Sequence, residues 1–172
     1  AFFADHGDND NLVVAGELVG GATPTTDQMS TNLLTVLSRL LGFVDDKGEP
    51  INEAARDFVV MVPPALYGVA VAAINASFTS SGASNPVAEL RSAGITMVAV
   101  VNARLSATDE FYMLRTDAGI RPFIVQQEMV DPVELGPESE HRTKTNHVYF
   151  GHGWAGGVGY GRYELACMAD LV

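Results

Sequence analysis

The chain has few cysteines, few lysines and no long apolar run. Its single cysteine, Cys167, excludes an internal disulfide and any cysteine-rich zinc site. No stretch approaches the roughly 18 apolar residues that a membrane-spanning helix needs, so we expect no membrane insertion. The lysines are Lys47 and Lys144, and the arginines are scattered. Because phosphate backbones are bound by clustered positive charge and the net charge is −11, we expect no specific nucleic-acid recognition.

The apolar content, by contrast, is sufficient for a full hydrophobic core. Hydrophobic residues make up 47% of the 172 residues and charged residues 18%, which is typical of one folded domain or a large part of one. The chain opens on Ala1 and has no basic stretch at its start. We therefore expect no secretory signal, and the lack of a starting Met leads us to expect that something upstream is missing.

Helical and extended patterns mix without regular alternation, which favours the α+β class. The clearest helix begins at Thr25 or Thr26 as N-cap and ends before Gly42, with apolar residues on one face. Asp45 to Gly48 is read as a turn, and residues 129–142 as an exposed, acidic, turn-rich loop. The remaining predicted elements are strands at 11–18, 58–62, 95–101, 110–115 and 121–127, and helices at 63–75 and 87–92.

Glycines dominate the last part of the chain. Gly151, Gly153 and Gly156 form a literal G-x-G-x-x-G. That motif binds a dinucleotide only when a helix follows it and an acidic residue lies about 20 positions further on. The chain ends at Val172, and the alternation after Gly161 suits a strand, so we expect no nucleotide cofactor. We interpret residues 146–151 and 156–166 as a closing β-hairpin whose glycines permit close backbone approach.

Two further regions carry residue types that could support chemistry. Asp5, His6 and Asp8 lie in an acidic stretch near the start, but it lacks the calcium-loop spacing, so we expect no metal. His152 lies between two glycines, although no nucleophile motif accompanies it. The alternative hypothesis is a small α+β enzyme or ligand-binding domain that uses the His6 loop or residues 151–161.

An ordered series of short motifs resembles a known family. The chain resembles the C-terminal part of the major head subunit of Mu-like phages and prophages, the gpT type, which is similar to the Hong Kong ninety-seven-type capsid fold of tailed phages. The motifs, in chain order, are residues 3–7 (FADHG), 62–66 (VPPAL), 111–114 (FYML), 121–128 (RPFIVQQE) and 159–166 (GYGRYELA).

The resemblance implies a fold and a function. The fold would be an axial domain plus part of the peripheral domain, with a mixed sheet flanked by helices. Residues 1–24 would lead in from the missing peripheral part, 25–120 would form the axial domain, and 121–172 would return to the sheet. The chain would be a non-enzymatic subunit of an icosahedral phage head, made in the bacterial cytoplasm and located in the virion. Its partners would be its own copies, in hexamers and pentamers, with scaffold or head-completion proteins as further candidates.

A Ser/Gly-rich loop at residues 76–85 is the predicted subunit contact. By the resemblance, it points toward the centre of the pentamers and hexamers. A loop with so little to bury is expected to be ordered by neighbouring subunits. The predicted contact residues are Thr79, Ser80, Ser81, Gly82, Ala83, Ser84 and Asn85.

Overall fold

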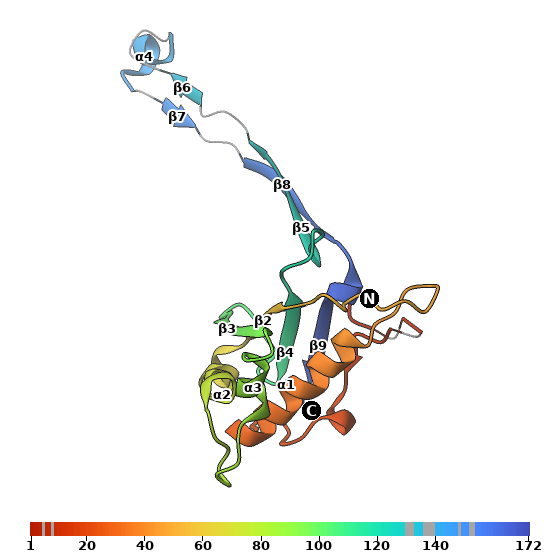
Figure 1. The fold of residues 1–172 in the computed structure, drawn as a ribbon. Coiled ribbons are helices and arrows are strands. Elements are labelled where there is room, and N and C mark those ends of the chain that lie inside the picture. Colours follow the sequence, from red (N-terminus) through yellow and green to blue (C-terminus); the bar gives the residue numbers. More distant parts are fainter. Residues whose placement is uncertain (5, 8, 130–132, 136–139, 148, 152–153) are drawn as a thin grey trace. The chain divides into compact units, whose positions relative to one another are not determined.

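A computed structural model describes residues 1–4, 6–7, 9–129, 133–135, 140–147, 149–151 and 154–172 (Figure 1). The chain divides into two compact units. Unit 1 comprises Ala1–Pro122 and Gly161–Val172, and unit 2 comprises Phe123–Tyr160. The predicted division at residues 24 and 120 rests on the family resemblance and stays a prediction.

Unit 1 is built on a five-stranded mixed sheet with the order β1-β9-β4-β2-β3. The β2–β3 and β1–β9 pairs are parallel, and the β2–β4 and β4–β9 pairs are antiparallel. The predicted α+β class and the mixed sheet flanked by helices are therefore confirmed. The strands are β1 (Leu12–Val13), β2 (Asp57–Val62), β3 (Thr96–Val101), β4 (Glu110–Arg115) and β9 (Ala166–Asp170).

Helices α1 and α2 cover one face of this sheet (Figure 1). On that face Phe58, Phe111 and Met113 are at most 1% exposed, and they pack with apolar residues of α1. On the other face Val98 is 51% exposed. The helical elements of the unit are α1 (Thr26–Leu41), α2 (Pro64–Asn75) and α3 (Pro86–Leu90), with 3-10 turns η1 (Ala15–Glu17) and η2 (Tyr163–Leu165).

Local signals place the helix starts. The Thr25 hydroxyl accepts from the Gln28 backbone, and the Gln28 side chain accepts from the Thr25 backbone, which completes a capping box. Asn85 caps α3 by accepting from the Val87 amide, and both α2 and α3 begin with proline in the first turn. The predicted starts of these helices are confirmed.

The described residues of unit 2 form two short antiparallel ladders and one helix. β5 (Phe123–Met129) pairs with β8 (Trp154–Tyr160), and β6 (Val133–Leu135) pairs with β7 (Tyr149–Gly151). Helix α4 (Glu140–Thr145) lies between β6 and β7 in the chain. The ladders are nested, so the first strand of the unit pairs with the last.

This nesting corrects two predictions. The closing hairpin of residues 146–151 with 156–166 is wrong, because β7 pairs with β6 and β8 pairs with β5. The loop at 129–142 is also wrong in part, since β6 and the start of α4 fall within it. Both errors have one cause. Pairing partners distant in the sequence leave no local signal, and sequence reasoning favours the nearest partner.

A third correction concerns the predicted strand at 11–18. Only Leu12–Val13 pairs with the sheet, and Ala15–Glu17 turns into a 3-10 helix. Val14 is 49% exposed, so the apolar run does not continue into the core. Among the described residues, no helix is both long and apolar enough to cross a membrane.

Candidate functional site

The loop at residues 76–85 forms a small hairpin of its own. Phe78 and Ser84 make an antiparallel bridge, and the Thr79 amide donates to the Ala83 carbonyl at 2.8 Å. The Gly82 amide donates to the Thr79 carbonyl at 2.9 Å, and Gly82 has a φ of 81°. Because this left-handed conformation disfavours a side chain, glycine is required at the turn.

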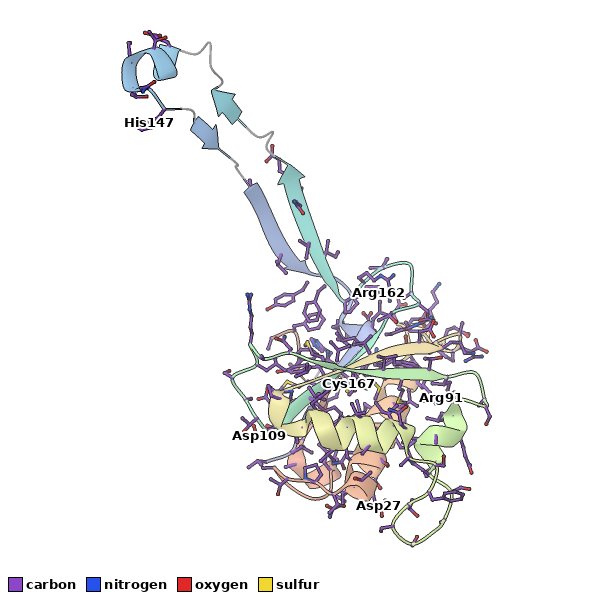
Figure 2. The ribbon with its side chains drawn as sticks, turned by 90° about the vertical axis from the view of Figure 1, so that its left-hand side faces the viewer. Asp27, Arg91, Asp109, His147, Arg162 and Cys167 are labelled. Atoms are coloured by element: carbon purple, nitrogen blue, oxygen red, sulfur yellow. The ribbon has the colours of Figure 1, made fainter. Side chains whose placement is uncertain are left out.

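Two anchors hold this hairpin to the rest of unit 1. The Asn85 side chain is 2% exposed and donates to the carbonyls of Ala73 at 2.7 Å and Ala76 at 2.8 Å. The Ser80 amide donates to Asp27 Oδ2 at 3.1 Å, and the Ser80 hydroxyl also contacts this carboxylate. Figure 2 shows Asp27 beside the loop.

Hydrogen bonds within the chain hold this loop. That neighbouring subunits also order it stays a prediction. The Asn85 side chain is turned inward, whereas Ser81 and Ala83 are exposed. Phe78 is 67% exposed at the base of the hairpin. The role of residues 79–85 as a subunit contact stays a prediction, and the side chains able to make it are those of residues 79–84.

The β5–β8 ribbon carries an apolar surface that sequence reasoning missed. In its register Phe123 lies opposite Tyr160, and Val125 lies opposite Val158, so all four side chains share one face. Val125 is 64% exposed, and Val158 and Tyr160 are each 73% exposed. The opposite face carries Ile124, Gln126 and Glu128. The sequence signal for this surface is the alternation of side chains between the two faces of the strand at 123–128. The sequence does not show that the strand pairs with β8.

Gly161 closes the base of this ribbon. Its amide donates to the Pro122 carbonyl at 2.8 Å. A Cβ on Gly161 would lie 2.0 Å from the Arg121 carbonyl oxygen, which is far inside contact distance. The glycine of the 159–166 motif is therefore required for close backbone approach.

The His6 loop serves the structure of unit 1 in every contact described. The His6 ring stacks on Tyr163 with centroids 4.0 Å apart, and His6 Nε2 lies 3.1 Å from the Phe2 carbonyl oxygen. The Asn11 side chain bonds Ala4 and Phe2 of the same segment. Asp5 and Asp8 lie outside the described residues. Among the described histidine, cysteine and acidic residues, no group of three could hold a metal ion.

In the described part of residues 151–161, the chain is extended and no helix begins. Residues 154–160 form strand β8, and the chain then passes through η2 into β9. A phosphate site of the G-x-G-x-x-G kind needs a helix at this point. Gly153 and His152 lie outside the described residues. His147 is exposed near the end of α4 (Figure 2).

Cys167 is equally unsuited to nucleophilic chemistry. It lies on β9 with 0% exposure, and burial raises the pKa of its thiol to about 12. Because the thiolate is the reactive form, this cysteine is inert near neutral pH.

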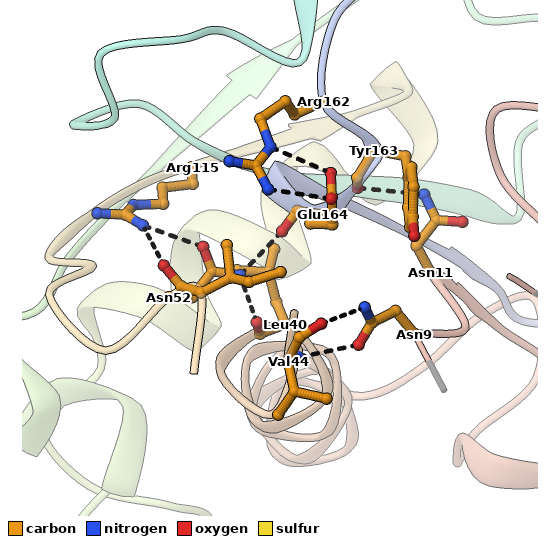
Figure 3. Close-up of polar contacts among 10 residues, drawn as sticks. Asn9, Asn11, Leu40, Val44, Asn52, Arg115, Arg162, Tyr163 and Glu164 are labelled. Carbon is orange, nitrogen blue, oxygen red and sulfur yellow. Dashed lines mark hydrogen bonds and ion pairs between the residues drawn. The ribbon is translucent and has the colours of Figure 1, made fainter. Parts of the chain in front are cut away.

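A buried polar network joins segments that are far apart in the sequence (Figure 3). The Asn52 side chain donates to the Leu40 carbonyl at 2.6 Å and the Glu164 carbonyl at 2.8 Å, and its oxygen accepts from Arg115 Nη1 at 3.0 Å. Arg115 Nε also donates to Asp117 at 2.6 Å. Asn52 is fully buried, and Arg115 is 9% exposed. The network is structural, since its polar groups are occupied by backbone or by each other.

The charge on Asp117 is set by this network. Burial acts to raise the pKa of Asp117, but hydrogen bonds from the Arg115 side chain and the Arg56 backbone outweigh it, so the pKa is lowered. On β4, burial and the hydrogen bond to Glu110 raise the pKa of Tyr112 well above its usual range. Tyr112 is therefore a neutral hydrogen-bond donor, not a base.

No protein-family model matches the chain, and no curated protein sequence matches it. Among solved structures, the chain is similar to a virus-like particle from Pyrococcus furiosus, with 15% sequence identity and a TM-score of 0.44. The match covers 93% of this chain and 56% of that one, so the chain spans little more than half the length of that neighbour.

Proposed function

We propose that this chain is a non-enzymatic structural subunit that associates with its own copies into a shell. The observation that carries the proposal is the apolar face of the β5–β8 ribbon, formed by Phe123, Val125, Val158 and Tyr160. A two-stranded ribbon has no interior in which to bury such side chains, and it is marginally stable alone in water. Contiguous exposed apolar surface of this kind is typical of an association site.

The shell is proposed to be the head of a tailed phage or prophage, with the subunit of the gpT type. This finer assignment rests on the ordered motifs at 3–7, 62–66, 111–114, 121–128 and 159–166. Two of those motifs end or begin in the ribbon, and Gly161 of the last is required by the close approach to Arg121. The described chemistry of unit 1 is consistent with a passive role, since its buried polar groups are committed to the fold.

Within that shell, the hairpin at 79–84 is proposed to approach its symmetry copies around five- and six-fold axes. Its tip is exposed, while Asn85 and Asp27 hold its base. A rigid, uncharged tip is suited to close packing of several copies about an axis. The further partners proposed from the resemblance are scaffold and head-completion proteins.

The test is particle formation by the full chain, with paired variants on the two faces of the ribbon. Val158→Glu places a charge on the apolar face and should reduce assembly at least about tenfold, because burying an unpaired charge is costly. Gln126→Glu places the same charge on the opposite face and serves as the matched control. Electron microscopy and sedimentation measure the outcome. Equal assembly of both variants, or a wild-type chain that stays monomeric at high concentration, would overturn the proposal.

The loop assignment has its own test. Ser81→Arg and Ala83→Glu both fall at the exposed tip, so the fold should stay intact. Converging like charges should lower the yield of capsomers. Normal yield from both variants would contradict the proposed position of the hairpin at the symmetry axes. It would not affect the role proposed for the ribbon.

A further inference from the structure

The sheet of unit 1 has an apolar strip on the face that α1 and α2 leave uncovered. In the parallel register of β2 and β3, Val59 lies beside Val98, and Met61 lies beside Val100. These four side chains, called the strip below, alternate with core residues of the same strands, so they are on the opposite face. Val98 is 51% exposed, Val100 is 44% exposed, and the other two are partly buried. Because a solvated sheet face is usually polar, the strip indicates a contact surface.

The surroundings of the strip limit what can lie on it. On the neighbouring strand β4, the Tyr112 ring has its centroid 5.4 Å from that of Phe3, so the N-terminal segment lies on that side. Asp57 is the first residue of β2, is exposed, and by alternation is on the same face as the strip. Among the described residues no cation pairs with it. The strip is therefore two strands wide, with a negative charge at the end where β2 begins.

The apolar face of the β5–β8 ribbon has matching dimensions. It presents an aromatic row, Phe123 with Tyr160, and a valine row, Val125 with Val158. Because neighbouring strands are about 4.8 Å apart in any sheet, this face and the strip have equal widths. Arg121 comes two residues before the aromatic row and is exposed, and no carboxylate of the described residues pairs with it. The ribbon therefore carries a positive charge at the base of its apolar face.

We propose that the apolar face of the ribbon in one copy of the chain packs on the strip of a second copy. The two surfaces meet face to face with their strands aligned, as two sheets do in a sandwich. The aromatic row then lies over Val59 and Val98, and the valine row lies over Met61 and Val100. Each surface gains from the other the apolar cover that it lacks in the single chain.

The occupant is a second copy because the charges beside the two surfaces are opposite and lie in matching positions. Asp57 precedes the strip by two residues on β2, and Arg121 precedes the aromatic row by two residues. Running β5 in the same direction as β2 places these charges side by side. Running it in the reverse direction would place Arg121 beyond Val100, away from the carboxylate. The inference rests on the proposed self-association and names the surface that the ribbon meets.

Chemical cross-linking tests the contact. Facing sheets are about 10 Å apart, which is too far for a disulfide, so a short bismaleimide is the reagent. Full-length Val100→Cys and Gln127→Cys chains, made separately and mixed with a tag on one of them, should give mixed covalent dimers. Gln127 follows the valine row on the same face of β5, whereas Gln126 is on the opposite face. The control mixture with Gln126→Cys should give at least about fivefold less mixed dimer. The native Cys167 is fully buried and stays out of the reaction.

Two results of this experiment would overturn the contact. One is an equal yield of mixed dimer from Gln127→Cys and Gln126→Cys. The other is a chain carrying both Val100→Cys and Gln127→Cys that cross-links internally at dilutions where it is monomeric, while the mixture of single variants gives no dimer. That result would show that the ribbon covers the strip of its own copy.

Charge exchange gives a second measurement. Asp57→Lys and Arg121→Glu should each weaken self-association about fivefold, as expected for one exposed ion pair, and the double variant should recover it. Glu89→Lys makes the same change of charge at an exposed position on α3, on the helix-covered side of the sheet, and should have no effect. Equal weakening by Asp57→Lys and Glu89→Lys would contradict the pairing.

Failure of this contact can be told from failure of the proposed function. A wild-type chain that stays monomeric would overturn both. Association that Val158→Glu weakens, together with equal cross-linking of the two glutamine positions and no rescue by the double charge variant, would overturn this contact alone.

Discussion

At the scale of single residues, the chain depends on a few buried polar side chains. Asn9, Asn11 and Asn52 are each at most 8% exposed, and each bonds backbone groups of a distant segment. The Asn52 amide alone joins the end of α1 to the turn before β9 and to Arg115. In the described part of the chain, no buried side-chain nitrogen or oxygen is left unpaired. Substitution of these asparagines would therefore leave buried backbone groups without hydrogen-bond partners, which destabilises the fold.

Asn52→Ala should lower the free energy of unfolding by about 3 kcal/mol, because it leaves the Leu40 and Glu164 carbonyls without the donor that they share and removes one hydrogen bond from the Arg115 guanidinium, which stays paired with Asp117. Urea denaturation followed by circular dichroism measures the change. Asn75→Ala, at an exposed asparagine, is the control and should cost no more than about 0.5 kcal/mol. A similar cost for both variants would show that the network contributes little.

The Arg115–Asp117 pair predicts a loss of stability in acid. The pKa of Asp117 is lowered from its ordinary value of 3.8 in the folded chain, so its contribution is fully present above that value. The contribution is lost as the pH falls through the lower pKa of the folded state. Asp117→Asn should therefore destabilise the chain near pH 7, and the difference from wild type should shrink between pH 4 and about pH 2. Urea midpoints across this range measure it, and a constant difference would contradict the prediction.

At the scale of elements, two kinds of strand coexist in the chain. Strands β2 and β4 are central in the sheet of unit 1 and bury one face against helices. Among the described residues, strands β5 and β8 pair only with each other, and β8 has glycine opposite Ile124, Gln126 and Gln127. Glycine contributes no cross-strand side-chain contact, so the ribbon gains little from its own pairing. We therefore expect the ribbon to be stabilised by contact with a partner surface.

Gly161→Ala should destabilise the chain by about 2 kcal/mol or more, because the new methyl group would overlap the Arg121 carbonyl and the backbone must shift. Gly157→Ala is the matched control, since a Cβ there meets nothing within 4 Å. Thermal and urea unfolding compare the two. If Gly161→Ala is as stable as the control, the close approach at the base of the ribbon is not required.

At the scale of the whole molecule, the buried core and the apolar face that we propose for association belong to different units. Every member of the buried core cluster belongs to unit 1. The apolar face of the ribbon belongs to unit 2. Pro122 and Gly161 are hydrogen-bonded to each other across the base of the ribbon. We therefore expect that a short turn could join these two residues in place of residues 123–160.

Replacing residues 123–160 with an Asn-Gly turn should leave unit 1 folded, because two-residue turns of this type close antiparallel pairs. The free energy of unfolding measured in urea should change by no more than about 0.5 kcal/mol, the range expected for distant, independent sites. Self-association should be lost in sedimentation experiments. An unfolded product would show that the units depend on each other, and a product that assembles normally would show that the ribbon is not the association surface.

The sequence by itself determined most of unit 1. The helix starts at Thr25 and Asn85, the buried strand before Pro63 and the α+β class could all be predicted, because caps, prolines and apolar periodicity act within a few residues. Composition indicated the Ser/Gly-rich loop. Its internal hydrogen bonds and its contact with Asp27 could not be predicted from composition.

Only the tertiary structure decided the pairing of strands and the closing network. The β8 strand pairs with β5 and not with β7, and Asn52 meets Glu164, which is more than one hundred positions away. The two faces of the ribbon and the apolar strip on β2 and β3 likewise follow from pairing. A strand's sequence records which of its side chains share a face, but its partner is chosen by distant segments competing for the same backbone groups. That competition is resolved only when the whole chain is folded.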